Sequence, residues 1–122
     1  MRTFLLATFA VLSMSATAVA QPVGNFAVVG RNPGASGGPP AYTAVMTVTP
    51  TGDSFEVVWT FGNTRVQGRG IWVNNVFSVA YTNRAPAGPA IAAYVLRPDG
   101  TWLGRWVIPG NPNSGTEVLT RR

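Results

Sequence analysis

Apolar and polar residues alternate with a period of two along much of the chain after residue 20. In the run 55–61 every second residue is aromatic or aliphatic, namely Phe55, Val57, Trp59 and Phe61. The runs 42–49 and 77–82 follow the same rule. Because the side chains of a β-strand point alternately to its two faces, this pattern predicts half-buried strands. No stretch of comparable length after residue 20 shows a helical stripe.

Turn-forming residues separate these runs at a spacing of about ten residues, which is typical of an all-β domain. Glycine, proline, asparagine and aspartate cluster at 50–53, 62–64, 74–75, 85–89, 98–100 and 109–112. Between them we expect eight short strands, at 25–32, 42–49, 55–61, 65–73, 76–82, 90–96, 102–108 and 116–120. The segment 33–40 is predicted to form a loop at one end of the fold.

Eight sequential antiparallel strands in a chain of this length have two good arrangements, a closed up-and-down barrel and a two-sheet β-sandwich. The short turns favour the barrel. Gly68, Gly70 and Gly104 lie within predicted strands, as expected where a coiled strand brings its backbone close to bulky neighbours. We therefore predict a single eight-stranded barrel domain over residues 21–122.

The first twenty residues resemble a secretory signal peptide. Arg2 is followed by an apolar run over residues 4–14, and Ala18-Val19-Ala20 supplies small residues before Gln21. We expect cleavage between Ala20 and Gln21 and an exported protein, either periplasmic or secreted. The apolar run is shorter than the roughly 20 residues of a membrane span, so we expect none.

The composition removes most routes to catalysis. The chain has no Cys, no His and no Lys, so a cysteine nucleophile, a thiolate zinc site and a histidine base are excluded. Without residues 1–20, eight Arg face four acidic residues, a net charge of +4. The Arg residues are scattered apart from Arg121-Arg122, so we expect no nucleic-acid binding. We predict a protein that is not an enzyme and has no cofactor.

The four carboxylates need individual interpretation. Glu56 and Glu117 could in principle cleave a glycosidic bond, but nothing in the sequence places them together. We expect both to be outward-facing strand charges, paired with Arg105 or Arg69 across a neighbouring strand. Asp99 and Asp53 are expected to cap their own turns. No loop carries more than one carboxylate, so we expect no metal site.

The aromatic residues are the most informative set, because most fall on one face of successive predicted strands. They must either fill the barrel or line an open lumen, and an eight-stranded barrel is wide enough for either arrangement. In an open lumen we expect ligand contacts from Trp59, Trp72, Tyr81 and Trp106, with Arg69 or Arg105 at a polar end.

The run 90–96, from Ala90 to Leu96, is apolar on both faces. One face of a barrel strand points outward, so this run predicts an exposed apolar strip. It could serve a protein partner or a homo-oligomer, or be covered by a loop.

The chain resembles known proteins in its predicted architecture and, more closely, in its sequence. The eight-stranded architecture resembles avidin-like and lipocalin-like ligand-holding barrels, although Gly-x-Trp lies in the predicted fourth and seventh strands and not in the first. More closely, the chain resembles small exported proteobacterial proteins, mostly uncharacterised and sometimes labelled fibronectin-binding. The resemblance rests on Val28-Val29-Gly30, Asn32-Pro33, Val57-Val58-Trp59, Gly68-Arg69-Gly70, Tyr81, Tyr94, Pro98-Asp99-Gly100, Leu103-Gly104-Arg105-Trp106 and Gly115-Thr116-Glu117-Val118-Leu119. It implies a barrel and an exported location.

Two classes of function follow from these observations. The first is a carrier that holds a small hydrophobic or sugar-like ligand in, or at the mouth of, an aromatic-lined barrel. The second is an interaction or adhesion module that uses its outer surface and has a filled core. The residues do not identify the ligand, the partner or the oligomeric state.

Overall fold

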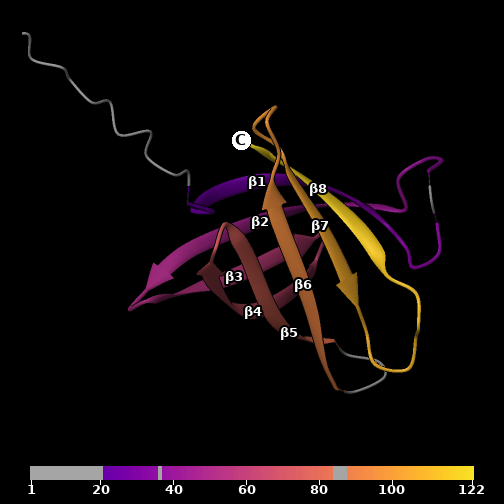
Figure 1. Cartoon of the computed structure of the whole chain (residues 1–122). Helices are drawn as coiled ribbons and strands as arrows, with labels where there is room; N and C mark the ends of the chain where they lie inside the picture. The colour runs from indigo at the N-terminus through magenta and orange to yellow at the C-terminus, as the bar shows by residue number, and fades with distance from the viewer. Residues whose placement is uncertain (1–20, 36, 84–87) are drawn as a thin grey trace, which may run out of the picture.

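The computed structural model of the chain is a closed antiparallel barrel in which each strand pairs with its neighbours in sequence and β1 pairs with β8 (Figure 1). It describes residues 21–35, 37–83 and 88–122; the expected signal peptide lies outside them. The predicted fold class, an eight-stranded up-and-down barrel, is therefore confirmed, and the sandwich alternative is excluded. The strands are β1 (Gly24–Arg31), β2 (Tyr42–Thr51), β3 (Ser54–Phe61), β4 (Thr64–Val73), β5 (Val76–Asn83), β6 (Gly88–Leu96), β7 (Trp102–Val107) and β8 (Gly115–Arg121).

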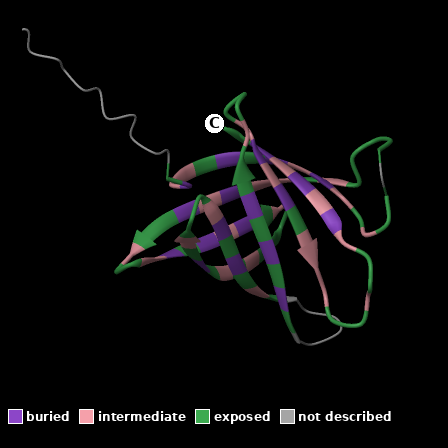
Figure 2. Ribbon diagram, in the orientation of Figure 1, coloured by how far each residue is buried: buried purple, intermediate pink, exposed green. Residues whose placement is uncertain are grey.

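The period-two pattern sets which residues face the interior. Buried and exposed positions alternate along the strands, as Figure 2 shows for the barrel wall. Phe55, Val57 and Trp59 of β3 are buried, and their polar neighbours Glu56 and Thr60 are exposed. The interior is one hydrophobic cluster with buried side chains from seven strands and the partly buried Val66 and Trp72 of β4 packed against it. The burial of this cluster is the main favourable term of folding.

Tight turns close the hairpins, as their residues predict. The β4–β5 turn consists of Asn74 and Asn75, with positive φ angles of 50° and 64°. Two consecutive residues with positive φ form a type I′ turn, whose twist matches that of the flanking strands. Asparagine tolerates this left-handed region better than other non-glycine residues.

The left-handed turn predicts the effect of substitutions at Asn75. Asn75→Val should lower the free energy of unfolding by about 1–2 kcal/mol, because a β-branched residue is strained at positive φ. Asn75→Gly is the matched control and should leave the stability unchanged or raise it. Urea denaturation of both variants measures the difference. Equal stability of the two variants would contradict the turn geometry.

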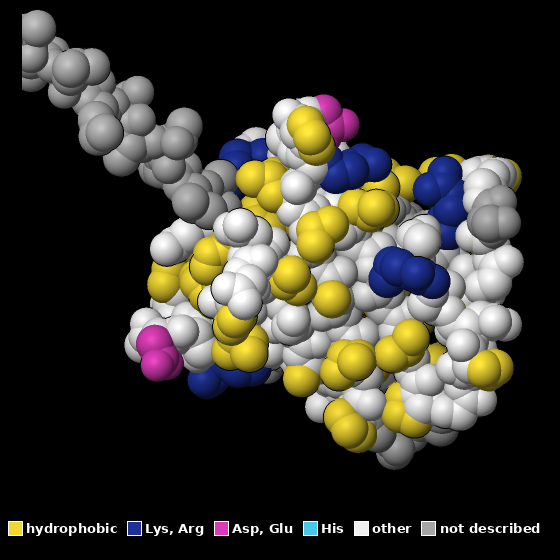
Figure 3. Space-filling view, viewed as in Figure 1, with side chains coloured by type: hydrophobic (Ala, Val, Ile, Leu, Met, Phe, Trp, Pro, Cys, Tyr) yellow, Lys and Arg dark blue, Asp and Glu magenta, His cyan; other side chains and the backbone are white. Residues whose placement is uncertain are grey.

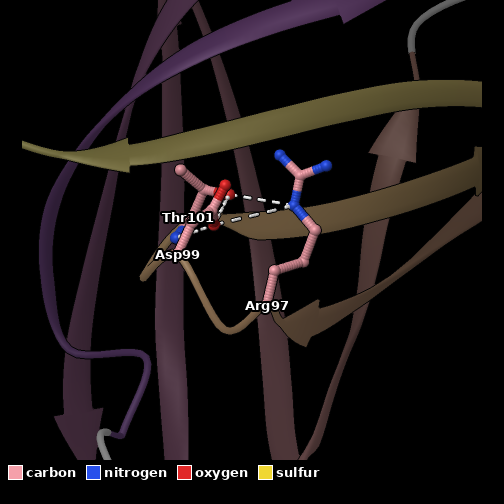
Figure 4. Close-up of polar contacts among 3 residues, drawn as sticks. All are labelled: Arg97, Asp99 and Thr101. Carbon is pink, nitrogen blue, oxygen red and sulfur yellow. Dashed lines mark hydrogen bonds and ion pairs between the residues drawn. The ribbon is translucent and has the colours of Figure 1, made fainter.

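The β6–β7 turn is held by Asp99, as predicted (Figure 4). Its Oδ1 accepts hydrogen bonds from the backbone N–H and the hydroxyl of Thr101, at 3.0 Å and 2.6 Å. Arg97 donates to the Thr101 hydroxyl at 2.9 Å and lies 3.9 Å from Asp99. These contacts lower the pKa of Asp99, chiefly through the Thr101 hydrogen bonds. Asp99 therefore has a structural role.

The two ends of the barrel differ. The end with the β2–β3, β4–β5 and β6–β7 turns is filled: Pro22 and Trp102 are fully buried there, and Trp102 packs edge-on against Trp72 with ring centroids 5.4 Å apart. The opposite end carries the longer β1–β2 and β7–β8 loops, which meet where Gly34 N–H donates to the Ser114 carbonyl at 3.3 Å. We call this loop end the mouth. The described residues contain no helix of the length and apolarity needed to cross a membrane.

Candidate functional site

A cavity of about 210 Å³ lies inside the barrel at the mouth. Its lining is mostly aromatic, and several of the lining side chains are only half-buried, so the cavity is reached from the loop end. We call it the mouth cavity. It is lined by Tyr42, Trp59, Phe61, Val66, Tyr81, Ala92, Tyr94, Trp106 and Glu117.

The mouth cavity contains a buried carboxylate. Glu117 of β8 is 5% exposed, and it is the one charged side chain that is buried among the described residues. The hydroxyl of Tyr42 donates to Glu117 Oε2 and that of Tyr94 donates to Oε1, each at 2.6 Å. Each oxygen of the carboxylate thus accepts one hydrogen bond, from a tyrosine of β2 on one side and a tyrosine of β6 on the other.

The strand register explains this arrangement. Glu117 lies opposite Gly30 of β1 on one side and opposite Gly104 of β7 on the other. Beyond these two glycines, the next strands place Tyr42 opposite Gly30 and Tyr94 opposite Gly104. One row across five strands therefore has the symmetric order Tyr, Gly, Glu, Gly, Tyr.

The two glycines of this row leave the space that the tyrosine rings occupy, because they have no side chain. A Cβ atom at Gly30 would overlap the ring of Tyr42, and one at Gly104 would overlap the ring of Tyr94. Each ring lies over the bare backbone of the intervening strand, which lets its hydroxyl reach the carboxylate on the strand beyond. Gly115 accommodates the ring of Trp106 at the mouth in the same way.

Burial dominates the electrostatics of the cavity. It raises the pKa of Glu117 above the usual 4.5, because a charge inside the barrel loses its hydration, while hydrogen bonds from Tyr42 and Tyr94 and the nearby Trp59 indole act against this rise. Burial, and then the Glu117 charge, raises the pKa of Tyr94 well above its usual 10.0 and that of Tyr81 to about 12. The tyrosines therefore remain neutral hydrogen-bond donors at physiological pH.

Two indole N–H groups in the cavity wall are left without a partner. Trp59 Nε1 and Trp106 Nε1 are buried. The Trp59 indole lies close enough to Glu117, and the Trp106 indole close enough to Tyr42, to lower the pKa values of these groups, but neither N–H completes a well-aligned hydrogen bond with another described residue. A buried donor without an acceptor costs free energy, and such groups are commonly satisfied by water or by a ligand. The mouth cavity thus offers unused donors beside its carboxylate.

The structure brings together three of the six residues proposed from the sequence. Trp59, Tyr81 and Trp106 line the mouth cavity, and the rings of Trp59 and Tyr81 lie 5.1 Å apart. Trp72 also faces inward, but it packs against Trp102 at the filled end. The barrel interior is therefore filled at the end with Trp72 and Trp102 and contains a cavity at the mouth.

The structure does not bring Arg69 and Arg105 to a polar end of the interior. Both are exposed, because each is flanked in its strand by inward-facing residues: Gly68 and Gly70 around Arg69, and Gly104 and Trp106 around Arg105. Arg105 donates instead to the Ser114 hydroxyl at the mouth, at 2.6 Å and 3.1 Å.

Glu117 is the main correction to the sequence-based interpretation. It was predicted to face outward and pair with Arg105 or Arg69, but it shares the inward face with Gly115 and Leu119. Glu56 does face outward, opposite Arg69 in the register, so the two glutamates are on different sides of the wall. Tyr42 and Tyr94 were also missed as site residues. The sequence offered no clear signal for Glu117, because β8 carries an apolar residue on each face, Val118 on one and Leu119 on the other.

The predicted apolar strip on β6 is present on the outer face. Ile91 and Val95 are 59% and 43% exposed, while Ala92 and Tyr94 between them point inward. Figure 3 shows apolar side chains with arginines among them on this side of the barrel. A hollow of about 820 Å³ crosses β4–β7 there, with Arg69 and Arg105 in its lining. None of the described residues that line this hollow has a buried polar side chain, so we place the candidate site in the smaller mouth cavity.

Comparison with known proteins adds no family to this description. The sequence matches no family model, and no curated protein is significantly similar to it.

Proposed function

We propose that this is an exported binding protein without catalytic activity, which holds a small ligand in the mouth cavity. The observation that supports this most directly is a cavity of about 210 Å³ with aromatic walls, a buried Glu117 carboxylate and two unpartnered indole N–H groups. Ligand sites are mostly apolar pockets with a few convergent polar groups. The volume is below that of pockets for drug-sized molecules, so the ligand is small, with a hydrophobic or sugar-like body.

The composition and the placement of the acids support binding over catalysis. A nucleophile or a general acid needs a partner, and the chain has neither His nor Cys nor Lys. Glu56 lies on the opposite side of the barrel wall from Glu117, so the two cannot flank one glycosidic bond. Export is proposed from the signal-like segment 1–20.

Blocking the cavity tests the proposed function. Ala92 is buried in the cavity wall, whereas its neighbour Ala93 is exposed on the outer face of the same strand. Native mass spectrometry of the mature protein from its own cell envelope should detect a bound small molecule. Ala92→Leu should lose it and Ala93→Leu should keep it. A clean apo mass for all three proteins would contradict ligand binding.

A second candidate function rests on the exposed apolar side chains of the outer face. Ile71, Val73, Ile91, Val95 and Leu96 are exposed large apolar residues, and a patch of this kind marks an interaction surface. We propose that this surface pairs two copies of the chain.

If two copies pair through this surface, the mass measured in solution should exceed the mass of one chain. Light scattering at micromolar concentrations should give a mass above that of the monomer. Ile91→Asp should return it to the monomer value, because a charge at the centre of the interface would be buried without a partner. Glu56→Gln, a change elsewhere on the outer face, should leave the mass unchanged. A monomer mass for the unmodified protein would remove this candidate.

A further inference from the structure

We propose that the ligand of the mouth cavity is a small organic cation, a protonated or quaternary ammonium compound, whose charge lies against the Glu117 carboxylate. The inference rests on the proposed binding function and adds the chemical class of the ligand.

The first argument is the charge inside the barrel. Glu117 is 5% exposed, and its described partners are the neutral hydroxyls of Tyr42 and Tyr94. No arginine lines the cavity among the described residues. Buried charges in proteins are normally paired, since an isolated one loses its hydration without compensation. A cationic ligand would supply a countercharge that none of the described residues lining the cavity provides.

The second argument is the wall around the carboxylate. The plane of the Tyr42 ring is inclined at 61° to the rings of Phe61 and Trp106, whose centroids lie 5.5 Å and 6.4 Å away. The planes of the Trp59 and Tyr81 rings are inclined at 58° to each other. These five rings come from β2, β3, β5 and β7, and all of them line the mouth cavity that holds the carboxylate. Aromatic enclosures of this kind recognise ammonium groups, because the electron-rich ring face attracts a cation.

The third argument concerns size and the remaining polar groups. At about 30 Å³ per water molecule, a cavity of about 210 Å³ holds roughly seven waters, so a ligand that replaced them atom for atom would be the size of choline. The unpartnered N–H groups of Trp59 and Trp106 require an acceptor. An ammonium compound with a hydroxyl or carbonyl oxygen would satisfy both requirements.

A cation bound beside Glu117 would also change the pKa of this carboxyl group. Burial raises the pKa of Glu117, and a positive charge beside it would lower that pKa again. The other titratable groups that face Glu117 from the described strands are Tyr42 of β2, Tyr81 of β5 and Tyr94 of β6, which stay neutral. Glu117 is thus the one group whose ionisation would change when the ligand binds.

The test compares choline with its uncharged isostere, 3,3-dimethylbutan-1-ol, by calorimetry and tryptophan fluorescence on the mature protein. We expect choline to bind at least tenfold more tightly than the isostere. Glu117→Gln should abolish that preference, because it keeps the shape of the side chain and removes its charge. Glu56→Gln, on the outer face, should retain the preference.

A second measurement uses the unmodified protein and so does not depend on how a variant folds. The affinity for choline should fall as the pH decreases and Glu117 is protonated, while the affinity for the isostere should not. Equal affinities for the two probes at every pH would overturn the cation inference and leave the ligand-binding function standing. If neither probe binds and native mass spectrometry shows no ligand, both proposals fail.

Discussion

Gly104→Ala should lower the free energy of unfolding by about 3 kcal/mol, although it adds only one methyl group. The new Cβ would overlap the ring of Tyr94, which is 1% exposed and whose hydroxyl is bonded to Glu117. Overpacking a core costs about 1–3 kcal/mol, and a strained or broken bond to a buried charged group adds a comparable amount. Of a typical total of 5–15 kcal/mol, this is a large fraction.

Urea denaturation with two comparisons isolates the cause. Thr60→Ala, at an exposed position of β3, should change the stability by less than about 0.5 kcal/mol. In a Tyr94→Ala background, Gly104→Ala should cost less than about 1 kcal/mol, because the ring that it would strike is gone. An undiminished cost in that background would show that the glycine matters for its backbone and not for the space above it.

The barrel could be predicted from the sequence because its signals are local. Alternation of period two marks each strand, and turn residues such as Asn74-Asn75 mark each reversal, so predicted and observed strand ends differ by two residues at most. Eight strands joined by short turns leave few topologies. The exposed apolar face of 90–96 followed from the barrel itself, because this run is apolar on both faces and one face of a barrel strand points outward.

The candidate site was harder to predict because it depends on register, which is not local. Glu117 lies 75 residues from Tyr42 and 23 from Tyr94 along the chain. Only the strand pairing shows that two glycines separate these three residues in one row. β8 also carries Val118 and Leu119 on opposite faces, so its apolar pattern did not show which face holds the glutamate.

The second large effect is a dependence of stability on pH that Glu117→Gln should remove. Burial raises the pKa of Glu117 in the folded protein above its usual 4.5. The unfolded chain therefore loses this proton at a lower pH than the folded protein does. The stabilisation associated with the raised pKa is complete below about pH 4.5 and is lost as the pH rises through the folded-state pKa. Within that window the loss approaches about 1.4 kcal/mol per pH unit, the value for one proton.

Chemical denaturation at a series of pH values, on the unmodified protein and on two variants, measures this effect. Glu117→Gln should lack the decline, because its amide can accept from one tyrosine hydroxyl and donate to the other without a buried charge. Glu56→Gln should retain the decline, because its carboxylate is exposed. Parallel profiles for Glu117→Gln and the unmodified protein would contradict the assignment of the pH dependence to Glu117.

The same substitution should separate stability from binding. At neutral pH, Glu117→Gln is expected to be at least as stable as the unmodified protein while losing its preference for a cation over the neutral isostere. A buried carboxylate that weakens the fold is the arrangement expected where function requires the charge. If Glu117→Gln instead weakened the fold at every pH and left ligand preference intact, the carboxylate would be a structural anchor for Tyr42 and Tyr94. A gain in stability together with lost cation preference would identify Glu117 as the centre of a binding site.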